Sequence, residues 1–220
     1  MAIAYLLGKG SAKLLHVKPN IPTLLVLSLL PDVDIIYDFL TGSQIHRGAT
    51  HSLIVALIVF IPIFIMYRKK AIPYFLALIS HAAIADFLIA GQLQLLWPFS
   101  TTEFGLNEIT SIYINIFSPV NIALELILFI AATAVLFKSG DWKVFFRADK
   151  TNLVLIIPLV TVLLPSTIGY PFTEPLILTV PLLAIAHLFY LVLFGIAVLK
   201  TLIAYVRPTK TQARLQHSKR

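Results

Sequence analysis

The chain has 220 residues, of which 59% are hydrophobic and 12% are charged. A soluble globular domain has roughly 45–50% and 25%, so an ordinary soluble fold is excluded. Several apolar stretches reach the roughly 20 residues that cross a bilayer core, which predicts an all-α polytopic membrane protein. Cysteine is absent, and this excludes disulfide scaffolds, thiolate metal sites and cysteine nucleophiles. The apolar opening lacks a basic segment and a small-residue cleavage site, so we expect it to remain in the mature chain.

Six apolar stretches have the length of membrane spans. In chain order they are Ile21 to Leu40, Ala49 to Tyr67, Ala71 to Ala90, Pro119 to Phe137, Asn152 to Ile168, and Leu176 to Tyr205. We expect the first to be broken, because it contains Asp32 and Asp34 and because Pro31 lacks a backbone donor. The pattern predicts one domain over residues 1–207 with about six membrane helices, followed by a basic cytoplasmic tail over residues 208–220.

Basic residues fall into four clusters, and lysine and arginine concentrate in short cytoplasmic loops. The clusters are Lys9, Lys13 and Lys18; Arg68, Lys69 and Lys70; Lys138, Lys143, Arg147 and Lys150; and Arg207, Lys210, Arg214, Lys219 and Arg220. Six alternating spans place all four clusters on one side, so both termini are predicted to be cytoplasmic. Of the 17 Lys and Arg residues, only Arg47 falls in an outer loop and only Lys200 within a span. The net charge of +7 is therefore explained by topology and by attraction of the tail to anionic lipid, and we expect no nucleic-acid partner.

Three imidazoles and three carboxylates lie in or beside the first three spans. They are Asp32, Asp34, His46, His51, His81 and Asp86. An ionisable group at membrane depth costs at least about 2.5–3.5 kcal/mol, so these groups should share a cavity with partners. Mixed nitrogen and oxygen ligands suit zinc, manganese or iron. We predict that the six side chains bind one or two divalent ions, Zn²⁺ before Mn²⁺ or Fe²⁺, near the outer face.

Two further features of the spans constrain this site. His81 and Asp86 are five residues apart, which corresponds to about 140° around a regular helix. They must therefore flank the metal, or the helix must be distorted between them. Glu125 lies about two turns, or roughly 9 Å, inside the outer end of its span, at a depth comparable to His81 and Asp86.

Four motifs together resemble those of the membrane-bound metal-dependent hydrolases, a family that includes a LexA-regulated bacterial inner-membrane protein. The motifs are Leu30-Pro31-Asp32-Val33-Asp34, His46-Arg47-Gly48-Ala49-Thr50-His51-Ser52, Ser80-His81 with Asp86, and Gly91 followed by Leu96-Trp97-Pro98. The resemblance covers about the first hundred residues, and beyond them only Asn121 and Glu125 look like the polar pair that many members carry. Members often have a histidine in the opening helix, whereas the nearest in this chain is His16. A fainter similarity links the His and Asp pattern to zinc-dependent phospholipases C.

The residues and the resemblance together predict an integral membrane hydrolase that acts through a metal-activated water. Its expected substrate is a lipid-linked or membrane-presented phosphate ester. Arg47 is expected to bind the substrate phosphate or to neutralise the aspartates, and Glu125 to act as a base, as a ligand or in helix packing. Thr50 and Ser52 read as helix caps, and His187 as a histidine satisfied by a neighbour.

Three alternatives to the hydrolase remain open from the sequence. The first is a buried polar network without a metal, in which carboxylate lone pairs would lack donors. The second is the ion site of a cation transporter or channel, which would require a polar path towards the cytoplasmic side. The third is a metal bound only for folding, in a protein without catalytic activity.

Overall fold

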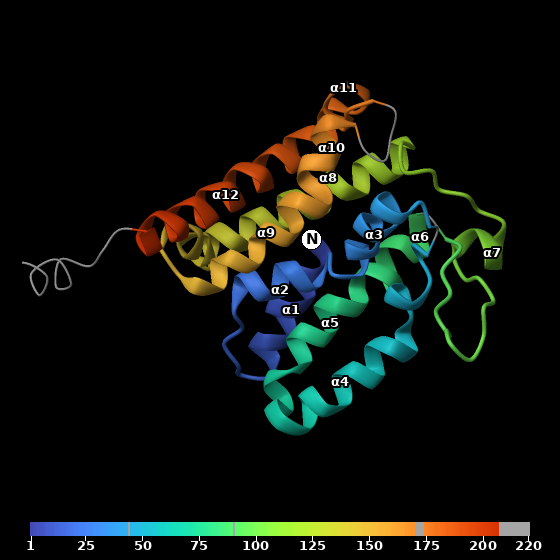
Figure 1. The fold of residues 1–220 in the computed structure, drawn as a ribbon, viewed down its shortest axis with the longest axis horizontal. Coiled ribbons are helices and arrows are strands. Elements are labelled where there is room, and N and C mark those ends of the chain that lie inside the picture. Colours follow the sequence, from blue (N-terminus) through green and yellow to red (C-terminus); the bar gives the residue numbers. More distant parts are fainter. Residues whose placement is uncertain (44, 90, 170–173, 207–220) are drawn as a thin grey trace, which may run out of the picture.

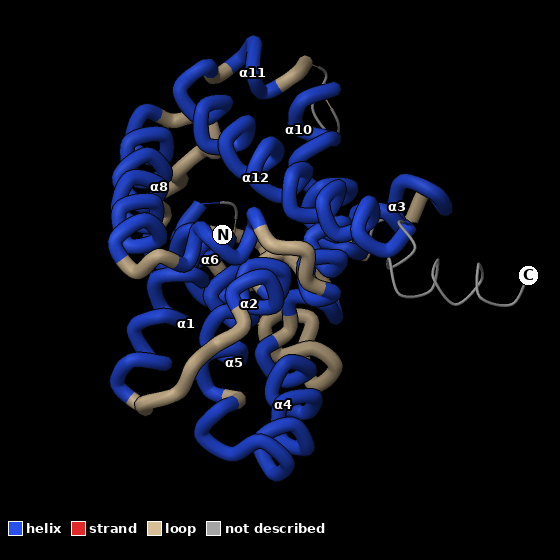
Figure 2. The backbone as a smooth tube through the Cα atoms, turned by 90° about the vertical axis from the view of Figure 1, so that its left-hand side faces the viewer, coloured by secondary structure: helices blue, strands red, loops and turns tan. Residues whose placement is uncertain are grey.

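The computed structural model of the chain describes residues 1–43, 45–89, 91–169 and 174–206. Regular structure in these residues is helical, and a single antiparallel bridge joins Leu93 to Phe104 (Figures 1 and 2). The predicted all-α class is confirmed. The predicted tail over residues 208–220 lies outside the described residues.

The N-terminal half supplies most of the polar motifs. Its helices are α1 (Ala2–Leu14), α2 (Ile21–Leu27), η1 (Pro31–Val33), α3 (Asp34–Thr41), η2 (Ala49–His51), α4 (Leu53–Tyr67), η3 (Arg68–Lys70), α5 (Ile72–Ser80), the π-helix η4 (His81–Asp86) and α6 (Phe87–Ile89). The predicted break in the first span is confirmed, since the chain there forms α2, the turn η1 and α3 in place of one helix.

The C-terminal half supplies the longest helices. Its elements are α7 (Leu106–Thr110), α8 (Pro119–Lys138), η5 (Asp141–Phe146), η6 (Lys150–Leu155), α9 (Ile156–Pro158), the π-helix η7 (Leu159–Leu163), α10 (Leu164–Ile168), α11 (Leu176–Thr179) and α12 (Pro181–Val206). The predicted last span is divided, because α11 ends at Thr179 and α12 begins at Pro181, which has no N–H to continue the earlier helix.

Four helical stretches of the described chain are long and apolar enough to cross a membrane: Ile72–Ile89, Pro119–Lys138, Lys150–Ile168 and Pro181–Val206. They correspond to the third, fourth, fifth and sixth predicted spans. The second predicted span contains α4, which has 15 residues, and the first is the broken segment. The protein is therefore a polytopic helical membrane protein in which the first two stretches are shorter than a full span.

The opening helix α1 is an element that the span pattern did not predict. It is only 13 residues long and contains Lys9 and Lys13, so it lacks the signature of a span. It nevertheless packs against α2, α5 and α8 with Ala4 and Tyr5 buried. Gly8 allows close approach to α2, because a Cβ at this position would lie 2.3 Å from Cδ1 of Leu24. Tyr5 Oη also donates a hydrogen bond of 2.8 Å to Asp141.

The main apolar core forms where these helices meet, and it includes the fully buried Leu24, Phe145, Leu155 and Phe194. Figure 1 shows α8, α9, α10 and α12 along one side of the molecule and α1, α2, α4 and α5 along the other. The short helices α3 and α6 lie at the end where these two groups diverge. The polar motifs belong to this end of the molecule.

Candidate metal centre

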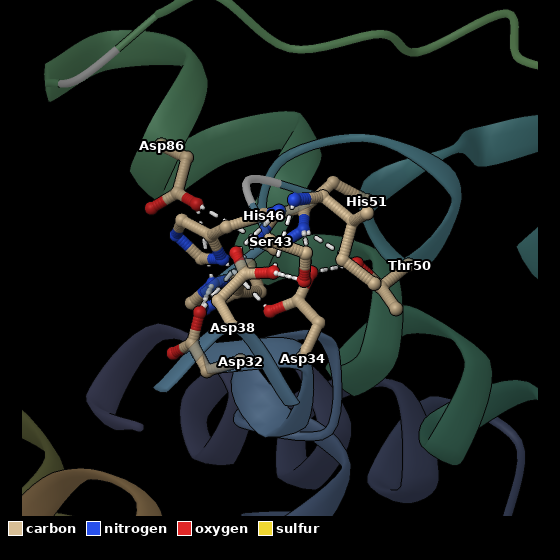
Figure 3. Close-up of polar contacts among 10 residues, drawn as sticks. Asp32, Asp34, Asp38, Ser43, His46, Thr50, His51 and Asp86 are labelled. Atoms are coloured by element: carbon tan, nitrogen blue, oxygen red, sulfur yellow. Dashed lines mark hydrogen bonds and ion pairs between the residues drawn. The ribbon is translucent and has the colours of Figure 1, made fainter. Parts of the chain in front are cut away.

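The six side chains expected to form one cluster come from five places along the chain. Asp32 lies in η1, Asp34 begins α3, His46 lies in the loop after α3, His51 ends η2, and the π-helix η4 carries the last two, His81 and Asp86. The structure brings all six together. Figure 3 labels five of them: Asp32, Asp34, His46, His51 and Asp86. The ligand atoms of the six side chains form two overlapping groups, and His51 belongs to both.

The first group contains Asp32, His51, His81 and Asp86, with ligand atoms within 4.8 Å of one another. His81 Nε2 lies 2.9 Å from Asp32 Oδ1 and 3.2 Å from Asp86 Oδ2. His51 Nε2 lies 3.3 Å from Asp86 Oδ2 and 3.6 Å from Asp32 Oδ1. Two imidazole nitrogens thus lie close to the oxygens of two carboxylates, near enough for all four side chains to contact one ion.

The second group contains Asp34, His46 and His51. His46 Nδ1 lies 2.8 Å from Asp34 Oδ1, whereas His51 Nδ1 lies 3.8 Å from Asp34 Oδ2. His51 therefore faces the first group with Nε2 and the second with Nδ1. A neutral imidazole has one lone pair on nitrogen, so His51 can serve as ligand in only one group unless it loses its second proton.

Thr50 decides which nitrogen of His51 carries the proton. The Thr50 hydroxyl donates a short hydrogen bond to Asp34 Oδ2, and its oxygen lies 3.1 Å from His51 Nδ1. Because the single hydroxyl proton goes to Asp34, the bond to His51 requires N–H on Nδ1. In the neutral ring Nε2 then carries the lone pair, and this buried atom has no hydrogen-bond partner in the described chain. A lone pair facing two carboxylates is stabilised by a cation, which is how the four-residue group fits a metal ion.

Helix geometry explains how His81 and Asp86 reach the same group. The segment between them is a π-helix, whose hydrogen bonds join residues five apart and so place such residues nearly in line. The spacing of five residues required either a distorted turn here or a position of the two residues on either side of the metal, and the structure shows the distorted turn. It has no local signal in the sequence, since the segment contains neither proline nor glycine.

The loop before η2 is held by Asp38, a residue that the sequence analysis missed. One oxygen of its carboxylate accepts the backbone N–H of Ile45 at 3.0 Å and the other that of His46 at 3.0 Å. The first oxygen also accepts the Ser43 hydroxyl at 2.7 Å. These contacts position His46 beside Asp34 (Figure 3). The spacing in the sequence could have identified Asp38, because Asp34 and Asp38 are four residues apart and so share a helix face.

Only one of the two expected helix caps is correct. Ser52 caps α4, since its hydroxyl oxygen accepts the backbone N–H of Val55 at 3.3 Å. Thr50 lies inside η2, and its hydroxyl is directed to Asp34 and His51. The prediction of a cap at Thr50 was wrong, because the 3₁₀ turn η2 precedes α4 and moves the helix start to Ser52.

The first group, Asp32, His51, His81 and Asp86, is called the metal group below because it could hold a metal ion. A cavity of about 630 Å³ adjoins it at Asp32. On one side it is lined by Asp32, His46 and Arg47, and on the other by α8, the π-helix η7 with α10, and α12. Arg47 forms no ion pair with a carboxylate in the described chain, and its Nε is buried without a partner. Glu125 lies on the opposite side, where its exposed side chain lines the cavity. The structure thus brings Arg47 and Glu125 to the same cavity.

The predicted partner for His187 is also present. Its Nδ1 lies 2.8 Å from the Ser166 hydroxyl, and both residues line the cavity. His187 is therefore a satisfied histidine, as expected, although it lies much nearer to the metal group's cavity than its position late in the chain indicated.

These features define a polytopic helical membrane protein with a buried histidine and carboxylate cluster that could hold a metal ion. Residues 1–209 match the family model described as YdjM inner membrane protein, and the chain therefore belongs to this family. This membership agrees with the motif resemblance to a LexA-regulated inner-membrane family and extends it over nearly the whole chain. Comparisons with curated proteins and with solved structures give no match.

Proposed function

We propose that this protein is an integral membrane metal-dependent hydrolase that acts on a lipid-linked or membrane-presented phosphate ester. The observation that carries the proposal is the buried Nε2 of His51, which lacks a hydrogen-bond partner in the described chain and lies 3.6 Å from Asp32 Oδ1 and 3.3 Å from Asp86 Oδ2. With a neutral His51, a polar network without a cation leaves the lone pair on Nε2 and the carboxylates in mutual repulsion. A divalent ion removes that repulsion.

Asp32, His51, His81 and Asp86 would hold the ion, and the mixed nitrogen and oxygen set suits Zn²⁺, with Mn²⁺ and Fe²⁺ as further candidates. When bound with an open position, such an ion supplies Lewis acidity and a water of lowered pKa. We favour one ion, because a second ion in the other group would need both nitrogens of His51 as ligands. Asp34 then orients His51 through Thr50.

Arg47 and Glu125 are the remaining polar groups assigned to the chemistry. The guanidinium of Arg47 has no carboxylate partner in the described chain, so its planar donors remain available for two phosphate oxygens. Glu125 lies across the cavity, where its carboxylate can accept a proton. Ile35, Ile116 and Leu183 add apolar surface to the cavity, which suits a substrate that carries an acyl or prenyl chain.

The test compares metal content and hydrolysis in the purified wild type and Arg47→Lys. We expect about one transition-metal ion per chain in both proteins, because the substitution leaves the ligands intact. Turnover of a panel of lipid and soluble phosphoesters should fall about tenfold or more in the variant, which is about 1.4 kcal/mol of transition-state stabilisation. Wild-type protein with a full metal complement and no phosphoesterase activity would defeat the proposal, and full activity in the variant would defeat the role of Arg47.

The packing of the core supports an enzyme over a cation transporter. A transporter needs a polar path that continues away from the cavity. Leu24, Phe145 and Phe194 are instead fully buried in the main core. Metal uptake into proteoliposomes that depends on Asp32 and His81 would favour transport.

A further inference from the structure

The side of the cavity opposite the metal group is built from hydrogen-bond acceptors. We define the acceptor wall as Asn121 and Glu125 of α8, Thr161 of η7, Ser166 of α10 and His187 of α12. These helices come from the second half of the chain, which contributes no member of the metal group. The wall is a separate structure that shares the same cavity.

The hydroxyl groups of the wall have already used their protons. Thr161 Oγ1 donates to the carbonyl oxygen of Ile157 at 3.0 Å, and Ser166 Oγ donates to that of Leu163 at 3.1 Å. With the Ser166 proton directed to that carbonyl oxygen, the contact of 2.8 Å between Ser166 Oγ and His187 Nδ1 is a hydrogen bond that His187 donates. This leaves His187 Nε2 as an acceptor.

The amide and the carboxylate add further acceptors. Asn121 Nδ2 donates to the carbonyl oxygen of Ile116 at 2.7 Å, which fixes the orientation of the amide. Asn121 is 0% exposed, and its Oδ1 is buried without a donor in the described chain. Glu125, one turn later, accepts no hydrogen bond from the described residues, and the positive charge that acts on it is the N-terminal ammonium of Met1. A buried acceptor without a donor, such as Asn121 Oδ1, is costly, and Glu125 adds a second free acceptor at the cavity, so this wall suits a ligand that supplies donors.

We propose that the acceptor wall is a substrate subsite that recognises a hydrogen-bond donor group, a hydroxyl or an ammonium, on the substrate's polar head. This inference rests on the proposed function, since the ester would lie between Arg47 at the metal side and the donor group at the wall. A substrate whose head group has no O–H or N–H leaves His187 Nε2 and Glu125 without a donor. Such a substrate therefore binds more weakly.

Three phospholipids with identical acyl chains separate donor recognition from charge recognition. Phosphatidylethanolamine offers N–H donors on a cation, phosphatidylglycerol offers O–H donors without a cation, and phosphatidylcholine is a cation without donors. Their binding to the purified full chain is measured by native mass spectrometry in competition. We expect the first two to bind about three- to tenfold more tightly than phosphatidylcholine, which corresponds to one or two hydrogen bonds.

Variants of His187 assign the preference to the wall. His187→Leu keeps the side-chain bulk and removes the acceptor, so the preference should fall to about one. His187→Gln carries an amide oxygen of similar reach and should retain it. Ile185→Ala is the matched control, because Ile185 lies on the same helix and is exposed. It should bind like the wild type.

The inference is overturned if the wild type binds all three lipids equally, if ethanolamine and choline lipids bind alike and above the glycerol lipid, or if His187→Leu keeps the preference. The binding measurement needs no turnover, so it separates this inference from the proposed function. A donor preference without hydrolysis of any lipid would defeat the function alone. Hydrolysis without a donor preference would defeat the subsite alone.

Discussion

At the scale of single residues, proton positions define the candidate site more than the identity of the ligands does. His51 is fully buried, and its two nitrogens face different neighbours. Thr50 gives its proton to Asp34 and takes one from His51, which aims the lone pair of His51 at Asp32, His81 and Asp86. In the proposed metal site, a hydroxyl that is not itself a ligand would thus orient a ligand.

Thr50→Val should weaken metal binding without removing any ligand. Valine is similar in shape but cannot relay the hydrogen bond, so the Nδ1–H form of His51 loses its support. We expect the dissociation constant for Zn²⁺ to rise about 10- to 100-fold, measured by competition with a chelator. Thr167→Val is the control, because the Thr167 hydroxyl is exposed and bonds only to the carbonyl oxygen of Leu164. Equal zinc affinity in both variants would disprove the relay.

Asp38→Asn should loosen the loop that carries His46. The carboxylate accepts three hydrogen bonds there, and an amide would direct N–H groups at one of these donors. The loop should then open more often, so amide hydrogen exchange at Ile45 and His46 should accelerate about tenfold or more. Asp149→Asn provides the comparison, because Asp149 holds a similar turn through Thr151 far from the site. Unchanged exchange at His46 would show that Asp38 does not hold the loop.

At the scale of secondary-structure elements, departures from regular helices position the groups that line the cavity. The π-helix η4 aligns His81 with Asp86, and η7 carries Thr161 of the acceptor wall. The break between α2 and α3 directs Asp32 and Asp34, which belong to an otherwise apolar segment, towards the histidines of the cluster. The broken segment is stabilised by the close packing of α1 on α2.

Gly8→Ala should destabilise the protein even though alanine favours helices. The added Cβ would lie 2.3 Å from Cδ1 of Leu24, whose side chain is fully buried. Overpacking of this kind costs about 1–3 kcal/mol, which exceeds the roughly 1 kcal/mol gained in helix propensity. The measurement is thermal unfolding in detergent.

Gly10→Ala is the matched control for this change, because nothing lies within 4 Å of a Cβ at Gly10 on the same helix. It should raise the unfolding temperature slightly. If both alanine variants unfolded at the same temperature, the close approach of α1 and α2 would be disproved.

At the scale of the whole molecule, the four basic clusters predict both termini in the cytoplasm and the metal group towards the outer face, where the loops carry Glu103, Glu108 and Glu174. Reporter fusions after Lys70, Lys150 and Arg220 should read cytoplasmic, and a fusion near Asn107 should read external. The physical reason is the retention of lysine and arginine on the cytoplasmic side during insertion. The opposite pattern of reporters would place the cavity on the cytoplasmic side.

The sequence by itself determined the class of the protein, the longest spans and the residues of the cluster. Apolar length is a local property, and the cost of an ionisable group in a membrane makes Asp32, His51 and His81 conspicuous without knowledge of their partners. The helix break at Pro31 is likewise local.

Only the tertiary structure decided how these residues act together. The role of Thr50 depends on Asp34, which lies 16 residues away in the sequence. The hydrogen bond between Ser166 and His187 forms only because α10 and α12 meet in space. Helix α1 has too little apolar length to be recognised alone, and its burial comes from α2, α5 and α8. Hydrogen-bond direction and packing arise between distant segments, so they become determined only when those segments are brought together.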